Sequence, residues 1–150
     1  MNISNILYAF TEDLVNAAGA GTPLKDVQIH ADIYEEIKPG KTIRVDDVRR
    51  ANPVILGSGQ IQKQNAVVPV HFLKMPVTQK VSDRLAARQV AEDMADVWLQ
   101  AYFNDPKLSD SEGNHRVCNI GEVFQFNEWI KPGTVKIPVV ILNLLINPRK

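Results

Sequence analysis

Residues 82–103 read SDRLAARQVAEDMADVWLQAYF, and this stretch decides the fold class. Its apolar residues recur every three or four positions, at Ala87, Val90, Ala91, Met94, Val97, Trp98, Ala101 and Tyr102. That spacing places them along one side of an α-helix, with Arg88, Glu92 and Asp96 on the other side. Asn104-Asp105-Pro106 follows, and proline cannot continue a helix. We therefore predict a helix of several turns that buries one apolar stripe.

The residues before this helix predict a shorter helix and then a strand. Residues 4–18 carry apolar side chains at helical spacing, with Ser4 as the expected cap and glycines at 19 and 21 where the helix should stop. Residues 27–33 alternate apolar and polar side chains, which is typical of a half-buried strand. The chain thus begins with a helix and a strand.

The middle of the chain predicts a turn and a hairpin. Lys38-Pro39-Gly40 has turn chemistry, and residues 46–50 are expected to form a single helical turn. Residues 53–61 and 66–77 are rich in Val, Ile and Leu and flank a polar connection, so we expect them to pair as a hairpin. Pro69 predicts an edge or a bulge in the second arm.

The end of the chain predicts a second hairpin, of residues 116–129 and 134–146, about Lys131-Pro132-Gly133. Its last arm, IPVVILNLLI, is almost continuously apolar, as a strand covered on both faces would be. We therefore predict one domain over residues 1–150. Its expected fold class is α+β, with a mostly antiparallel (mixed) sheet and two main helices packed on one face.

Charge and composition narrow the function classes. The 150 residues have a net charge of zero, which argues against sequence-specific nucleic-acid binding because phosphate contacts favour a basic excess. The charges are uneven: residues 1–37 sum to −5, 38–88 to +7, 89–128 to −6 and the remainder to +4. Such unlike blocks suit head-to-tail contact between copies. The N-terminus lacks a basic signal-peptide region and no apolar run would span a bilayer, so we expect a soluble protein.

No residue pattern predicts a catalytic, metal or cofactor site. His115 and Cys118 stand close together, but a zinc site needs about four ligands and there is no second pair. Glu92 and Asp96 share a helical face, yet Arg88 lies four residues before Glu92, as on a solvated helix surface. We expect no cofactor and no bound metal.

The element order resembles that of the small tail-terminator and head–tail joining (neck) proteins of long-tailed bacteriophages. The resemblance is carried by residues 4–18, the hairpin 53–77, the helix 82–103 and the strands 116–126 and 134–146. It implies a non-enzymatic virion component that forms a homo-oligomeric ring, commonly a hexamer. Such a ring caps the tail tube and docks to neck or connector proteins, with the sheath a further neighbour. The implied location is the host cytoplasm during assembly and then the virion.

The expected subunit or partner contacts are charged residues of the basic segment, the long helix and the loop after it. They are Lys38, Lys41, Arg44, Arg49, Arg50, Glu92, Asp93, Asp96, Lys107 and Glu112. We expect the basic residues 38–50 to meet the acidic face of the long helix on the next subunit. The alternative is a small intracellular ligand-binding domain or enzyme with a pocket between helix and sheet, built around Asp32, His71 and Glu122.

Overall fold

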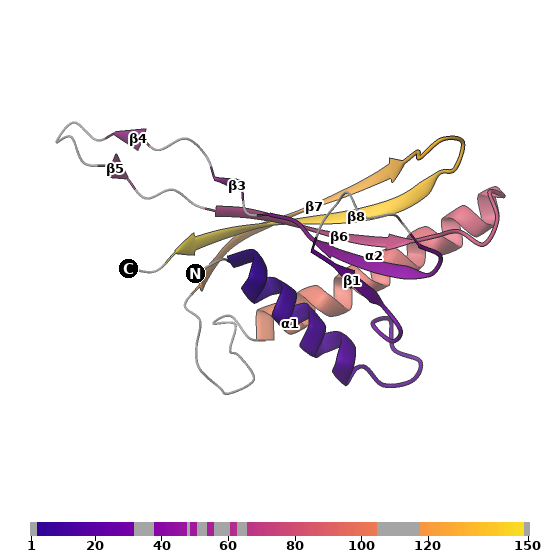
Figure 1. Cartoon of the computed structure of the whole chain (residues 1–150), viewed down its shortest axis with the longest axis horizontal. Coiled ribbons are helices and arrows are strands. Elements are labelled where there is room, and N and C mark those ends of the chain that lie inside the picture. The colour runs from indigo at the N-terminus through magenta and orange to yellow at the C-terminus, as the bar shows by residue number, and fades with distance from the viewer. Residues whose placement is uncertain are drawn as a thin grey trace.

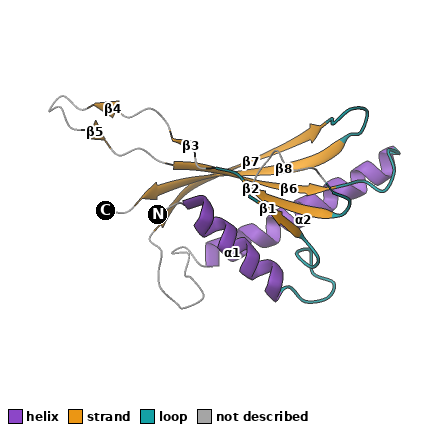
Figure 2. Ribbon diagram, in the orientation of Figure 1, coloured by secondary structure: helices purple, strands orange, loops and turns teal. Residues whose placement is uncertain are grey.

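The computed structural model describes residues 3–31, 38–47, 49–50, 54–55, 61–62, 66–104 and 118–148. Two helices, α1 (Ile3–Ala17) and α2 (Val81–Asn104), lie on one face of a twisted sheet (Figure 1). This is the predicted α+β fold with both helices on the same side. The two termini lie at one end of the molecule, and the turn between the last two strands lies at the other (Figure 2).

The main sheet has the strand order β1-β2-β6-β8-β7. The strands are β1 (Gln28–His30), β2 (Lys41–Val45), β6 (Ala66–Lys74), β8 (Ile137–Pro148) and β7 (Cys118–Ile130). All neighbours are antiparallel except β1 and β2. The short strand β3 (Arg49–Arg50) also pairs with β6, while β4 (Val54–Ile55) and β5 (Ile61–Gln62) pair only with each other. The sheet is therefore mixed but mostly antiparallel, as predicted.

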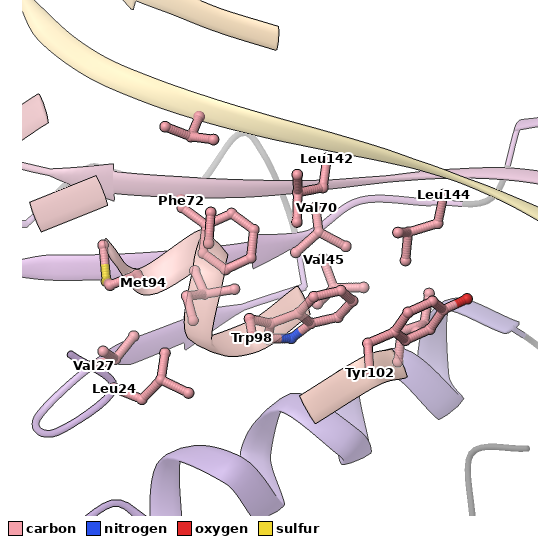
Figure 3. Packing of buried hydrophobic residues seen from close by; sticks show 14 of the residues in the cluster. Leu24, Val27, Val45, Val70, Phe72, Met94, Trp98, Tyr102, Leu142 and Leu144 are labelled. Carbon is pink, nitrogen blue, oxygen red and sulfur yellow. The ribbon is translucent and has the colours of Figure 1, made fainter. Parts of the chain in front are cut away.

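The main core lies between the helices and the sheet (Figure 3). Phe72, Leu142 and Leu144 reach it from β6 and β8, and Met94, Trp98 and Tyr102 reach it from α2; all are fully buried. The aromatic rings pack closely, with Trp98 stacked on Tyr102 at 5.2 Å between ring centres and perpendicular to Phe10 at 5.6 Å. The helix stripe was predicted correctly except at Val97, which is 39% exposed.

A hydrogen bond inside this core joins the two helices. The indole Nε1–H of Trp98 donates to Oγ1 of Thr11 at 2.9 Å, and the Thr11 hydroxyl donates to the carbonyl of Leu7 at 2.7 Å. Thr11 is fully buried. A tryptophan in a dry core needs such an acceptor, because a buried N–H without one is destabilising.

The structure corrects the expected role of Ser4. The helix already includes Ile3, so Ser4 is not its cap. Its side chain is buried instead, and Oγ donates to the backbone carbonyl of Asp46 at 2.9 Å. This contact fixes the start of α1 to the end of β2.

Two predictions for the middle of the chain are wrong. Lys41–Val45 forms a central strand that was not predicted, and residues 46–50 do not form a helical turn, since Asp46 and Asp47 are irregular and Arg49–Arg50 is a strand. Among the described strands, the expected hairpin arms 53–61 and 66–77 do not pair with each other, since Val54–Ile55 pairs with Ile61–Gln62. β6 pairs with β2, β3 and β8 instead, because those strands let its apolar side chains face the core.

Pro69 was expected to mark an edge or a bulge, and the edge is wrong: β6 pairs on both sides, and its register with β8 runs unbroken through Pro69 and Asn143. Only the pairing on its other side is interrupted. The carbonyl of Pro69 accepts a hydrogen bond from the Asp46 amide, and the ladder with β2 ends there. Proline has no N–H that could donate a hydrogen bond to the neighbouring strand. The pairing of β6 with β2 therefore stops here, and β6 pairs next with β3.

The second hairpin was predicted correctly. β7 and β8 turn about Gly133, whose φ of 67° is left-handed, and a register shift between Ile120 and Val123 marks a bulge in β7. The expectation that both faces of β8 are covered holds at its start, where residues 137–140 are buried, whereas Ile141 and Asn143 are half-buried. Val140 and Leu142 face the helices, whereas Ile137 and Val139 belong to a second apolar cluster with Leu73.

Candidate interaction surfaces

The basic segment predicted as a contact surface does not form one surface. Lys38 is exposed, but Lys41 is half-buried and its Nζ donates to the carbonyl of Pro23 at 2.9 Å. Arg44 is only 6% exposed: it alternates with core-facing Ile43 and Val45 and lies on the other face of the sheet. Its expected partner contact stays a prediction.

The remaining basic contacts lie at the border of the described chain. Arg49 and Arg50 are placed as the two residues of β3, which leads toward the β4–β5 pair (Figure 1). Their side chains lie outside the described part, as do Lys107 and Glu112. For these four residues the expectation of partner contacts stays a prediction.

The acidic face of the long helix is present on α2. Glu92 Oε1 lies 3.7 Å from Nε of Arg88, the expected pair at i and i+4. Asp93 Oδ1 accepts a hydrogen bond from Nε2 of Gln89 at 2.9 Å, and Asp96 is exposed. These surface contacts leave the carboxylates in reach of solvent.

Lys41 and Asp93, which were expected to meet across two subunits, line one hollow within a single chain. The hollow of about 460 Å³ lies between α2 and the ends of β2 and β6, and Asp26 and Lys74 also line it. Burial lowers the pKa of the Lys41 ammonium; nearby Asp26 opposes this shift and Lys74 adds to it. These two residues therefore line a common hollow within one chain, and their expected contact across subunits stays a prediction.

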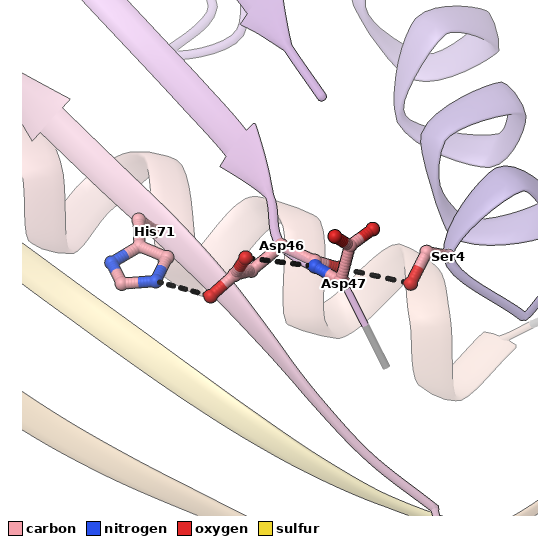
Figure 4. A network of polar contacts seen from close by, with 4 residues as sticks. All are labelled: Ser4, Asp46, Asp47 and His71. Atoms are coloured by element: carbon pink, nitrogen blue, oxygen red, sulfur yellow. Dashed lines mark hydrogen bonds and ion pairs between the residues drawn. The ribbon is translucent and has the colours of Figure 1, made fainter. Parts of the chain in front are cut away.

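A row of polar side chains crosses the sheet face turned away from the helices. His30, Arg44 and His71 are register partners on β1, β2 and β6. Nε2 of His71 lies 3.9 Å from Oδ2 of Asp46, whose Oδ1 accepts a hydrogen bond from the Asp47 amide at 2.8 Å (Figure 4). Buried polar side chains are tolerated in a fold when they have partners, and the contact between His71 and Asp46 is one such pairing.

Only His71 of the alternative site can be located in full. Asp32 lies outside the described residues, and Glu122 is placed in β7 without a described side chain. The described side chains contain no group of three or more His, Cys, Asp or Glu that could hold a metal ion. His115 is outside the described residues, and Cys118 begins β7.

A second hollow was missed by the sequence analysis. It has a volume of about 540 Å³ and lies between the first turns of α2 and the β7–β8 turn, lined by Val81, Arg84, Leu85, Trp129, Lys131 and Lys136. A weak signal existed in the sequence, because Val81, Arg84 and Leu85 are neighbours at helical spacing, and Arg84 lies two turns before Ala91 on the side of the predicted stripe. Nothing local indicated that residues 129–136 would face them.

The chain also presents a long strand edge. β7 has 13 residues and, among the described strands, pairs only with β8. An edge strand carries backbone N–H and C=O groups that can pair with another chain. The β4–β5 pair lies apart from the main sheet, beyond the start of β6 (Figure 1).

Comparison with known proteins gives no assignment. Neither a protein-family model nor a curated protein sequence matches this chain. In the described part of the chain, no helix has the length and apolar character needed to cross a membrane.

Proposed function

We propose that this chain is a structural virion component, a ring-forming tail terminator or head–tail joining protein of a long-tailed bacteriophage. The observation that carries the proposal is the pair of unlike β surfaces, the long edge of β7 and the separate β4–β5 pair. Unlike surfaces make heterologous contacts, and heterologous contacts with a closing rotation generate rings. Of the elements that carry the resemblance, the two helices α1 and α2 and the β7–β8 hairpin support the same class, whereas the hairpin expected over residues 53–77 is not among the described strand pairs.

The proposed ring caps the tail tube and docks to the neck. Its partners are further copies of the chain, in a hexamer by the resemblance, together with tail-tube, connector and sheath proteins. The protein assembles in the host cytoplasm and ends in the virion. No catalysis is needed for this role, since binding energy alone closes a ring and holds its neighbours.

Light scattering on a sizing column, across protein concentration and salt, tests the ring. A discrete multimer that weakens with salt is expected, because contacts between charged surfaces are screened. A strict monomer at every concentration would contradict self-assembly.

The Arg49→Glu/Arg50→Glu variant tests the part of the chain beside β4. It should shift the multimer toward monomer while the thermal unfolding of the monomer stays nearly unchanged. Lys25→Glu/Lys80→Glu is a matched control, since both lysines are exposed and the change in charge is the same. If the arginine variant assembles like the control, residues 49–50 are not part of the interface.

A small-molecule binding domain or enzyme is the second candidate. The hollow that contains Lys41 and Asp93 favours it, because this hollow lies between helix and sheet where the alternative places its pocket. A screen of metals and common cofactors by thermal shift separates the candidates. A saturable stabilisation that Lys41→Met abolishes would favour the binding domain over the ring component.

A further inference from the structure

The hollow between α2 and the β7–β8 turn is preformed. The Gln79 side chain, just before α2, donates from Nε2 to the carbonyl of Lys136 at 3.3 Å and accepts from the Lys136 amide through Oε1 at 2.8 Å. This pair of hydrogen bonds ties the start of the helix to the hairpin. The walls therefore need little ordering when a ligand binds, which favours affinity.

Its charge is one-sided. Arg84, Lys131 and Lys136 line the hollow, and among the described residues no carboxylate does so. Asp83 lies next to Arg84 in sequence, but its carboxylate accepts a hydrogen bond from the Thr78 hydroxyl. Nε of Arg84 is buried and has no hydrogen-bond partner in the described part of the chain.

Its apolar walls are exposed. Val81 is 61%, Leu85 47% and Trp129 37% exposed, which is unusual for large apolar side chains gathered at one place. Trp129 is the register partner of Pro138, two residues from the buried Val140, so it lies on the sheet face turned toward α2. The volume is in the range of ligand-binding pockets.

We propose that this hollow binds an acidic peptide segment of a partner protein, with one large apolar side chain against Trp129 and Leu85 and carboxylates on the three cations. Charge complementarity identifies the occupant. A nucleic acid fits less well, because its affinity rests on a longer track of phosphate contacts than three cations supply. The inference gives the chemistry of the docking partner and so rests on the proposed function.

Tryptophan fluorescence gives a direct assay. The chain has two tryptophans, and Trp98 is fully buried, so a ligand in the hollow changes chiefly the emission of Trp129. The probe is the end-blocked peptide Glu-Glu-Phe-Glu-Glu, compared with Lys-Lys-Phe-Lys-Lys and Glu-Glu-Ala-Glu-Glu. The first should bind about tenfold more tightly than either of the others. The lysine peptide loses two or three surface ion pairs, and the alanine peptide loses the burial of one large apolar side chain.

The Lys131→Glu/Lys136→Glu variant should weaken the acidic peptide about tenfold or more, by the same reasoning. Lys25→Glu/Lys80→Glu, with an equal change in charge and no residue in the hollow, should leave the affinity within about twofold. Circular dichroism melting confirms that both variants are folded. Equal affinity of the acidic and basic peptides, no binding, or no loss in the variant with a melting curve like the wild type would overturn the proposal.

A second copy of the chain is the competing occupant. If it fills the hollow, the Lys131→Glu/Lys136→Glu variant lowers the mass of the multimer and the acidic peptide competes with self-association. That outcome would overturn the proposal of an acidic partner peptide, whereas the proposal that the chain forms a ring would stand. A peptide that binds a strictly monomeric chain would do the reverse, so the two proposals fail separately.

Discussion

Replacing Thr11 with valine tests the hydrogen bond that joins the two helices. Valine keeps the shape of threonine but removes the acceptor of the Trp98 indole N–H, which lies 2.9 Å from Oγ1 in a fully buried site. Leaving a buried donor unpaired costs about 1–3 kcal/mol, so we expect the free energy of unfolding to fall by about 2 kcal/mol. The lost donation to the Leu7 carbonyl adds little, because that carbonyl lies within the helix ladder.

The same substitution in a Trp98→Phe background isolates the hydrogen bond. Phenylalanine has no N–H, so Thr11→Val should then cost about 0.5 kcal/mol or less, and the coupling energy should be about 1–2 kcal/mol. Trp98→Phe alone should cost about 2–3 kcal/mol, because the smaller ring leaves a cavity beside Tyr102 and Phe72.

Urea unfolding followed by far-ultraviolet circular dichroism measures these free energies without relying on tryptophan emission. Thr22→Val is the matched control, since it also removes a hydroxyl that donates to a backbone carbonyl, that of Gly19 at 2.7 Å, but at an exposed site. Its coupling to Trp98→Phe should be about zero, since the two sites share no partner. An equal cost of Thr11→Val in both backgrounds would refute the reasoning.

Three further predictions follow from single contacts. The pKa of Lys41 is lowered in the fold from 10.5, so the unfolded state binds a proton at this side chain more readily than the folded state. The stability of the wild type relative to Lys41→Met should therefore rise with pH between the lowered pKa and 10.5. Urea unfolding at several pH values measures this difference. Gly133→Ala should cost about 1 kcal/mol from its left-handed φ of 67° alone, since a Cβ there meets no atom within 4 Å, and Gly133→Asn should cost less; thermal melts compare the two. Gln79→Ala should lower stability by about 1 kcal/mol and speed amide exchange of Lys136, because it removes both hydrogen bonds to the hairpin; unchanged exchange would mean that these bonds do not hold the hairpin.

Periodicity predicted the elements whose partners are close in sequence. The long helix has a stripe set by its own spacing, and β7 and β8 meet through a short turn, so local chemistry was enough. It failed for β2 and β6, because alternation indicates that a segment is a strand but not which strand it joins. β6 pairs with β8 about seventy residues later in the chain, as in Phe72 with Val140, and local turn signals do not reveal such a pairing.

The same limit applies to the interaction surfaces. The cationic hollow unites Arg84 with Lys131 and Lys136, residues from two charge blocks that the sequence analysis counted separately. Conversely, Lys41 and Asp93 come from blocks of opposite sign and end in one hollow. The net charge of a segment does not describe a surface by itself, because the topology places its residues on different faces: Arg44 is buried in the sheet, whereas Lys41 borders a hollow beside α2.

The Arg49→Glu/Arg50→Glu and Lys131→Glu/Lys136→Glu variants test different parts of the molecule, so the two assembly experiments are independent. Arg49 and Arg50 form β3, which pairs with the start of β6 toward the end of the molecule that holds the termini, whereas Lys131 and Lys136 lie at the β7–β8 turn (Figure 2). Loss of the multimer in the arginine variant alone, with peptide binding intact, would assign one end to ring closure and the other to docking. Loss of the multimer in both variants would mean that copies join end to end, with the cationic hollow of one against the opposite end of the next. The pattern across both variants, rather than either result alone, therefore separates the ring's own interface from the docking surface.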